Sequence, residues 1–153
     1  MIRRATALLA LLAPTPALAC PAIDPVLLFH EAAASPRDFV ILYGDMGTGP
    51  LRADSEPAPA FIAAVLAHML TPGGFTAPFE AVSMQVRHVC QDGACGELAS
   101  GEDVLIFAHL SEDEPFAGTY VTEVGPCGRW VQPNPSRAEL DALTLCARGA
   151  CPY

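Results

Sequence analysis

The sequence predicts a mainly β domain that is stapled by disulfides and followed by a C-terminal helix. Three observations lead to this fold class. Several short segments alternate apolar and polar residues or are rich in β-branched and aromatic residues, six cysteines are spread along the chain, and a helix-capping signature precedes the last apolar stripe. The cysteines are Cys20, Cys90, Cys95, Cys127, Cys146 and Cys151.

Residues 1–19 have the pattern of a cleavable signal peptide. A positively charged start is followed by an apolar run over Ala5–Ala13, and small residues precede Cys20. The run is too short to cross a bilayer, since a membrane helix needs about 20 apolar residues. We therefore expect a periplasmic or secreted protein whose mature chain, residues 20–153, forms a single domain.

Lipoprotein anchoring at Cys20 is the alternative for this N-terminus. A lipoprotein site usually carries leucine three positions before the cysteine, whereas this chain has Ala17 there. A lipidated Cys20 would also leave five cysteines and strand one thiol, while a free Cys20 lets all six pair in an oxidising compartment. The sequence therefore favours cleavage to an unmodified Cys20.

The charge of the mature chain excludes two classes of partner. Cleavage removes two of the eight arginines and none of the 17 acidic residues, so the formal charge becomes −11, and the chain has no lysine. Such a surface repels nucleic-acid phosphates and anionic lipid headgroups. We expect no nucleic-acid partner and no membrane insertion after signal cleavage.

Four segments of the mature chain carry strand signals. The first is expected to stop at Tyr43, because glycines follow at positions 44, 47 and 49. We expect a loop with one helical turn over Pro25–Ala34 and an exposed loop over residues 50–59. The four predicted strands are Phe39–Tyr43, Phe79–Val89, Asp103–Leu110 and Gly118–Val124.

The segment Ala60–Leu70 is ambiguous. Phe61, Val65 and Met69 recur at helical spacing, yet Phe61-Ile62 and Val65-Leu66 could equally line a buried strand. Periodicity alone favours a helix. The turn signal Thr71–Gly74 follows it.

The segment from Cys90 to Cys95 predicts a tight hairpin. Asp92-Gly93 is a favoured two-residue turn, so Gln91 and Ala94 become the closing hydrogen-bonded pair. The two cysteines then lie opposite each other in a pair whose Cα atoms are about 4.5 Å apart, which suits a disulfide. We predict a Cys90–Cys95 bond.

The last helix has clear start and stop signals. Ser136 and Glu139 form a capping box, Leu140 and Leu143 begin an apolar stripe, and Gly149 is a natural stop.

The remaining cysteines are assigned from this helix. Cys146 and Cys151 repeat the C-x4-C spacing, and a chain reversal at Gly149 would bring them together. Cys20 is then left to pair with Cys127.

The order of these elements resembles netrin-like domains and the N-terminal domain of tissue inhibitors of metalloproteinases. The resemblance covers most of the mature chain. It rests on Cys20, the early strand Phe39–Tyr43, Cys95-Gly96, the segment Gly101–Ala108, Cys127-Gly128-Arg129 and the final helix with its cysteine.

This resemblance implies an OB-like closed β-barrel of about five strands with a C-terminal helix, and hence a strand at Ala60–Leu70. In the inhibitors, the amine and carbonyl of the N-terminal cysteine bind the protease zinc, a role that would fall to Cys20. The inhibitor pattern also implies an alternative disulfide that ties Cys20 near Cys95.

Arg129 and Trp130, next to Cys127, are the candidate recognition residues, because Trp and Arg dominate binding hot spots. The alternative interpretation is a tryptophan that caps the barrel core beside a disulfide. The four histidines lie on separate elements, and no zinc spacing, phosphate loop or serine elbow is recognisable. We expect no metal, no cofactor and no catalytic residue.

The sequence therefore favours an exported, non-catalytic binding module whose partner is a protein. One alternative is a metalloprotease inhibitor that acts through Cys20. Another is a periplasmic enzyme without a recognisable motif.

Overall fold

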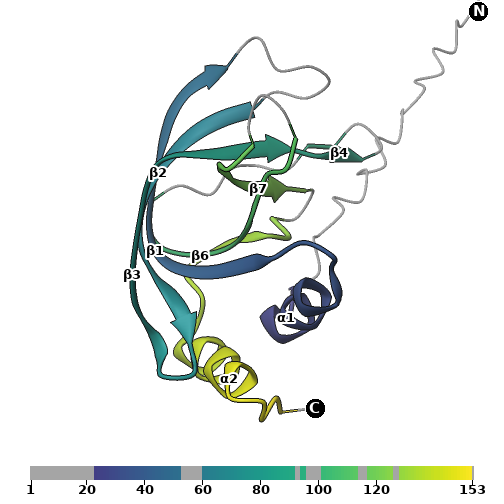
Figure 1. Ribbon diagram of the computed structural model, residues 1–153, viewed down its shortest axis with the longest axis vertical. Helices are drawn as coiled ribbons and strands as arrows, with labels where there is room; N and C mark the ends of the chain where they lie inside the picture. The colour runs from purple at the N-terminus through teal and green to yellow at the C-terminus, as the bar shows by residue number, and fades with distance from the viewer. Residues whose placement is uncertain are drawn as a thin grey trace, which may run out of the picture.

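The protein is a five-stranded closed barrel with two helices on its outside (Figure 1). The computed structural model describes residues 23–52, 60–91, 94–95, 101–113, 117–125 and 128–152. The helices are α1 (Pro25–Ala34) and α2 (Arg137–Ala147). The strands are β1 (Phe39–Arg52), β2 (Ala60–Thr71), β3 (Gly74–His88), β4 (Cys90–Gln91), β5 (Ala94–Cys95), β6 (Gly101–Leu110), β7 (Tyr120–Val124) and β8 (Val131–Pro133).

The barrel closes because β1 pairs with both β2 and β6. The order around it is β1-β2-β3-β7-β6, and β8 adds to β6 as a short sixth strand of the sheet. All neighbours are antiparallel except β3 and β7, which run parallel from the pair Gln85 and Val121 to the pair His88 and Val124. The predicted fold class, an OB-like barrel with a C-terminal helix, is confirmed.

Two apolar clusters hold the fold together, one on each face of β6. The interior cluster fills the barrel, and the outer cluster lies between the outer face of β1 and β6 and the two helices. Each fully buried aliphatic side chain contributes about 1.5–3 kcal/mol relative to exposure. The interior cluster is Leu42, Met46, Ala63, Val65, Ala67, Met84, Val86, Val104, Ile106, Ala108, Val124 and Val131. The outer cluster is Leu28, Ala32, Ile41, Leu105, Phe107 and Leu143.

The prediction of a loop with one turn over Pro25–Ala34 is wrong, because this whole segment is α1. The side chain of Asp24 caps the helix by accepting a hydrogen bond from the Val26 N–H at 2.8 Å. Pro25 occupies the first turn, where its missing N–H costs nothing. The helix is then fixed by burial of Leu28 and Ala32 in the outer cluster.

The predicted end of the first strand at Tyr43 is also wrong, since β1 continues to Arg52. Gly44 lies inside the strand, at a place where β2 approaches closely. A Cβ atom built there would lie 2.5 Å from the carbonyl oxygen of Leu66 and 2.6 Å from the Cα atom of Ala67. Glycine therefore serves strand packing here and does not end the strand.

The ambiguous segment Ala60–Leu70 is a strand, as the family resemblance implies. Ala63, Val65 and Ala67 are buried in the interior, and the residues between them are exposed. Leu66 is 64 % exposed despite being apolar. This outward leucine obscures the two-residue alternation. The four-residue spacing of Phe61, Val65 and Met69 suits one face of a strand as well as one face of a helix.

Other strand boundaries also differ from the sequence prediction. β6 begins at Gly101 and not at Asp103, and β3 ends at His88 and not at Val89. β3 begins at Gly74, directly after the β2–β3 turn, and not at Phe79. β7 begins at Tyr120, because Gly118 belongs to the preceding turn with a φ of 80°. The pairing of β6 with β7, which the sequence predicts as a hairpin, is confirmed.

The predicted hairpin between Cys90 and Cys95 is present in the backbone. In β4 and β5, Cys90 lies opposite Cys95 and Gln91 opposite Ala94, as the turn chemistry predicts. Cys90 is in a disulfide, while the side chain of Cys95 lies outside the described residues, so the Cys90–Cys95 bond stays a prediction.

The C-terminal helix is confirmed in detail. Ser136 N–H donates to Glu139 Oε2 at 2.6 Å, and Glu139 N–H donates to Ser136 Oγ at 3.3 Å, which completes the capping box. Gly149 has a φ of 77°, and Cys146 is bonded to Cys151 as predicted.

Several predictions lie outside the described residues. They are the signal peptide at residues 1–19, Cys20, Cys127 and their bond, and most of the loop at residues 50–59.

Candidate functional site

A cleft of about 360 Å³ opens at one end of the outer cluster. Its walls come from the end of α1 and the connection to β1, from β6 and β7, and from the turn before β8. Aromatic rings form its floor, and charged side chains form its rim. The lining residues are Glu31, Ser35, Pro36, Arg37, Phe39, Phe107, His109, Glu123 and Trp130.

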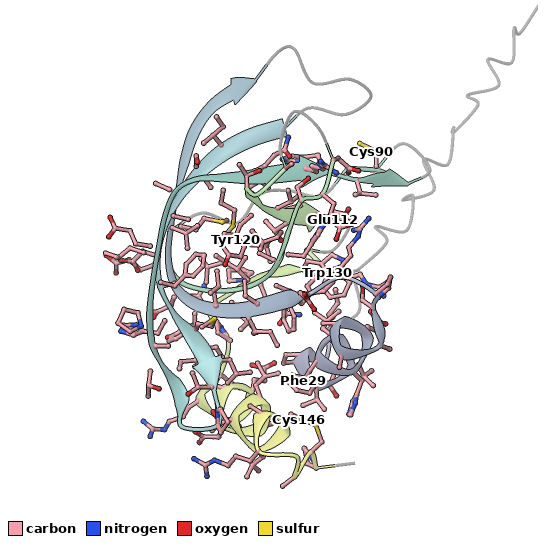
Figure 2. All side chains as sticks on the ribbon, in the orientation of Figure 1. Phe29, Cys90, Glu112, Tyr120, Trp130 and Cys146 are labelled. Atoms are coloured by element: carbon pink, nitrogen blue, oxygen red, sulfur yellow. A yellow bond between two sulfur atoms is a disulfide. The ribbon has the colours of Figure 1, made fainter. Side chains whose placement is uncertain are left out.

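Strand register brings the floor residues together. Phe39 of β1 is the register partner of His109 of β6, and Phe107 lies two residues earlier on the same outward face. The Trp130 ring stacks on Phe39, with ring centroids 5.2 Å apart and an angle of 28° between the rings. Its edge contact with Phe107 has a centroid distance of 5.7 Å. In the view of Figure 2, the labelled Trp130 lies above α1.

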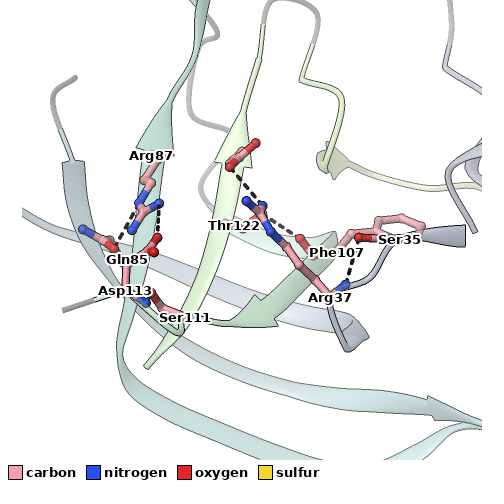
Figure 3. A network of polar contacts seen from close by, with 9 residues as sticks. Ser35, Arg37, Gln85, Arg87, Phe107, Ser111, Asp113 and Thr122 are labelled. Atoms are coloured by element: carbon pink, nitrogen blue, oxygen red, sulfur yellow. Dashed lines mark hydrogen bonds and ion pairs between the residues drawn. The ribbon is translucent and has the colours of Figure 1, made fainter. Parts of the chain in front are cut away.

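Backbone hydrogen bonds hold this floor in place. The Phe107 N–H donates to the Trp130 carbonyl at 2.9 Å, which ties the turn to β6. The Thr122 hydroxyl donates to the Phe107 carbonyl at 2.8 Å, which ties β7 to the same residue (Figure 3). The backbone N–H and carbonyl of Phe107 are thus both hydrogen-bonded, so the backbone that carries the ring is held from two sides.

His109 is the polar element of the floor. It exposes only 6 % of its surface, and its ring centroid lies 5.2 Å from that of Phe39. Among the described residues, none makes a hydrogen bond with its imidazole. Burial lowers the pKa of His109, and the nearby Arg37 guanidinium lowers it further. The ring is therefore neutral at neutral pH, with one N–H donor and one nitrogen acceptor.

Two ion pairs form the rim. Arg37 lies 3.5 Å from Glu123, with the two side chains 51 % and 33 % exposed. Arg129 pairs with Glu31 of α1, and its Cζ atom lies 5.4 Å from the centre of the Trp130 ring. Exposed pairs of this kind contribute about 0–1 kcal/mol to stability, so their main effect is to fix the side chains around the opening.

The connection between α1 and β1 is fixed by a local bond. The Arg37 N–H donates to Ser35 Oγ at 3.1 Å, which turns the chain so that Arg37 faces β7 (Figure 3). Ser35, the hydroxyl at the cleft, is thereby engaged with the backbone.

A second polar network lies beside the cleft on β3. The Arg87 Nε donates to Gln85 Oε1 at 3.3 Å, and an Arg87 guanidinium nitrogen lies 3.8 Å from Asp113 (Figure 3). Asp113 is placed by its own N–H, which donates to Ser111 Oγ at 3.2 Å. Arg87 lowers and Asp113 raises the pKa of His109, both less than burial does.

The structure brings together only part of the predicted site. Arg129 and Trp130 both lie at the cleft, and Trp130 packs against the outer cluster and not against the barrel interior. Cys20 and Cys127 lie outside the described residues.

Sequence reasoning missed the other cleft residues, Phe39, His109, Arg37, Glu31 and Glu123. One signal for His109 is present in the sequence. It continues the outward alternation of Leu105 and Phe107 along β6, so it occupies a position that elsewhere on this face is apolar.

Within the described ranges, no cluster of three or more His, Cys, Asp or Glu side chains could hold a metal ion. Neither of the two described helices has the length and hydropathy needed to cross a bilayer. A comparison with protein-family models, curated proteins and solved structures gives no match.

The geometry suits binding by contact. An aromatic floor, one largely buried imidazole and a rim of paired charges together favour a flat, mostly apolar group that enters the cleft and packs against Phe39 and Trp130.

Proposed function

We propose that this chain is an exported, non-catalytic binding module that recognises a protein partner through the aromatic cleft. The observation that carries the proposal is the aromatic floor of Phe39, Phe107 and Trp130 inside a cleft whose charges are already paired. Binding hot spots in protein interfaces have this character, with Trp, Tyr and Arg enriched in a desolvated centre.

The state of the polar side chains supports binding over catalysis. Glu31 and Glu123 are each in an ion pair, and Ser35 Oγ accepts a backbone hydrogen bond. These groups hold the shape of the cleft. A general base would instead need to lie within hydrogen-bond reach of a substrate proton, and a nucleophile would need an adjacent base to activate it.

The test is partner capture with matched variants. The processed, oxidised protein would be used as bait in an extract of its own compartment, and the retained protein identified by mass spectrometry. Phe39→Ala should weaken the affinity for that partner by more than about tenfold, because a central aromatic anchor is typically worth about 2 kcal/mol or more. Leu66→Ala, on the exposed face of β2, is the control and should leave the affinity unchanged.

Two results would contradict the proposal. One is a partner that binds Phe39→Ala as tightly as the unchanged protein while both remain folded by circular dichroism. The other is turnover of a substrate that disappears when a single polar residue of the cleft is replaced.

A further inference from the structure

We infer that the group recognised by the cleft is a tyrosine side chain of the partner protein, whose ring packs against the edges of Phe39 and Trp130 and whose hydroxyl hydrogen-bonds to His109. This inference rests on the proposed function and names its ligand. It follows from the size, the charge and the unused hydrogen-bonding capacity of the cleft.

The size of the cleft limits what can enter. Sites for drug-sized ligands span about 300–1,000 Å³, so a cleft of about 360 Å³ is at the small end of that range. It suits one aromatic side chain with its neighbouring backbone. The floor rings Phe39 and Trp130 stack on each other, and the Arg129 guanidinium lies over Trp130, so a further ring is offered their edges.

The rim favours an uncharged group. Arg37 is neutralised by Glu123, and Arg129 by Glu31. A carboxylate or an ammonium entering the cleft would meet counter-charges that are already paired and largely exposed, so it would gain little from the rim. A neutral ring causes neither loss.

His109 favours a ligand ring that carries a hydrogen-bonding atom. Its imidazole is more than nine-tenths buried, lines the cleft and has no hydrogen bond within the described part of the chain. The imidazole nitrogens of His109 are not among the buried side-chain atoms that lack a partner, so they are accessible from the cleft. A ligand hydroxyl can replace water as their hydrogen-bond partner with a modest net gain in affinity. Phenylalanine cannot do this.

Tyrosine fits better than tryptophan. A phenol can both donate and accept a hydrogen bond, so it satisfies either tautomer of the neutral His109 ring. The indole N–H can only donate. Tyrosine is also among the side chains most enriched at interface centres.

The test uses single-residue probes and the single tryptophan of the chain. Binding of N-acetyl-tyrosinamide, N-acetyl-phenylalaninamide and N-acetyl-tryptophanamide to the nitrogen-15-labelled protein would be followed by NMR at the Trp130 indole N–H. We expect the tyrosine amide to bind about two- to tenfold more tightly than the phenylalanine amide, the difference that one net hydrogen bond provides. Equal affinities, a preference for the tryptophan amide, or no shift of the indole resonance with any probe would overturn the inference.

Variants assign the preference to His109. In His109→Phe, the tyrosine amide should bind no better than the phenylalanine amide. In His68→Phe, an exposed position on β2, the preference should stay. A tyrosine preference that survives His109→Phe would overturn the assigned contact, and the comparison of the three probes on the unchanged protein remains decisive if that variant does not fold.

The two proposals fail in different ways. If the captured partner depends on Phe39 but the probes show no tyrosine preference, the cleft is the binding site and the tyrosine assignment is wrong. If the partner does not depend on Phe39, the proposed function itself is wrong.

Discussion

The two faces of β6 differ in how completely they are filled. Val104, Ile106 and Ala108 point into a barrel that closes around them. On the opposite face, Leu105 and Phe107 are covered by the helices and Trp130, but the next outward residue, His109, borders an open cleft. The inward face of β6 thus belongs to a closed core. Its outward face belongs to a second core that opens into the candidate site at one end.

This difference separates stability from recognition. Changes on the inward face should alter unfolding with no selective effect on binding, and changes at the open end of the outward face should affect binding more than unfolding.

Ile106→Ala should lower the free energy of unfolding by about 2–5 kcal/mol, because it leaves a cavity in the barrel interior. Urea denaturation followed by circular dichroism measures this. Leu66→Ala is the matched control, since Leu66 points outward from β2 and is 64 % exposed. Similar losses in the two variants would contradict the assignment of the inward face.

Gly44→Ala should lower the free energy of unfolding by about 1–3 kcal/mol, because the added methyl group meets backbone atoms of β2 that cannot move aside without shifting the strand. The same denaturation experiment applies. Gly47→Ala is the control within β1, as a Cβ atom there has a nearest neighbour at 3.9 Å. A neutral Gly44→Ala would show that the barrel relaxes at this crossing.

Acidification should reduce stability through His109. The folded pKa of His109 lies below its value in the unfolded chain, so the unfolded state takes up the proton first. Its contribution is fully present above the unfolded pKa of about 6.5 and is lost as the pH falls from there towards the lowered folded pKa.

The measurement is the free energy of unfolding at a series of pH values for the unchanged protein and for His109→Gln. The variant should lose less stability between neutral and mildly acidic pH. Arg37, Arg87, Glu123 and Asp113 remain in both proteins, so their titration cancels in the difference. Parallel pH profiles would contradict the environment assigned to His109.

Arg37→Ala should change the free energy of unfolding by no more than about 0–1 kcal/mol, because its ion pair with Glu123 is largely exposed. Its effect on partner affinity should exceed its effect on stability, since it frees Glu123 at the opening. A stability loss well above this range, measured by urea denaturation, would show that the rim supports the fold.

Local chemistry made parts of the fold predictable. The Asp92-Gly93 turn determines the register of Cys90 with Cys95, and the Ser136–Glu139 box determines the start of α2. Gly44 was misread because glycine weakens a strand locally, while the close approach of β2 that requires it is a tertiary contact. α1 was missed because its stability comes from burial against β1 and β6, which a short sequence window does not contain.

Only the part of the candidate site in the turn before β8 was predictable from the sequence. Arg129 and Trp130 are adjacent and of residue types that favour recognition, so a linear reading finds them. Phe39 and His109 meet through strand register, and Glu31 reaches Arg129 from a helix 98 residues away in the chain. Such a cleft exists only once the barrel has closed.

The position at which a tyrosine probe binds distinguishes the cleft from the rest of the surface. Backbone and side-chain NMR shifts would be mapped during titration of the labelled protein with N-acetyl-tyrosinamide. We expect the largest shifts at Phe39, Phe107, His109 and Trp130, with little change at the interior residues Val65 and Met84. Shifts concentrated on the outer face of β2 and β3, with Trp130 and His109 unchanged, would contradict the central claim that the open end of the outward face is the binding site.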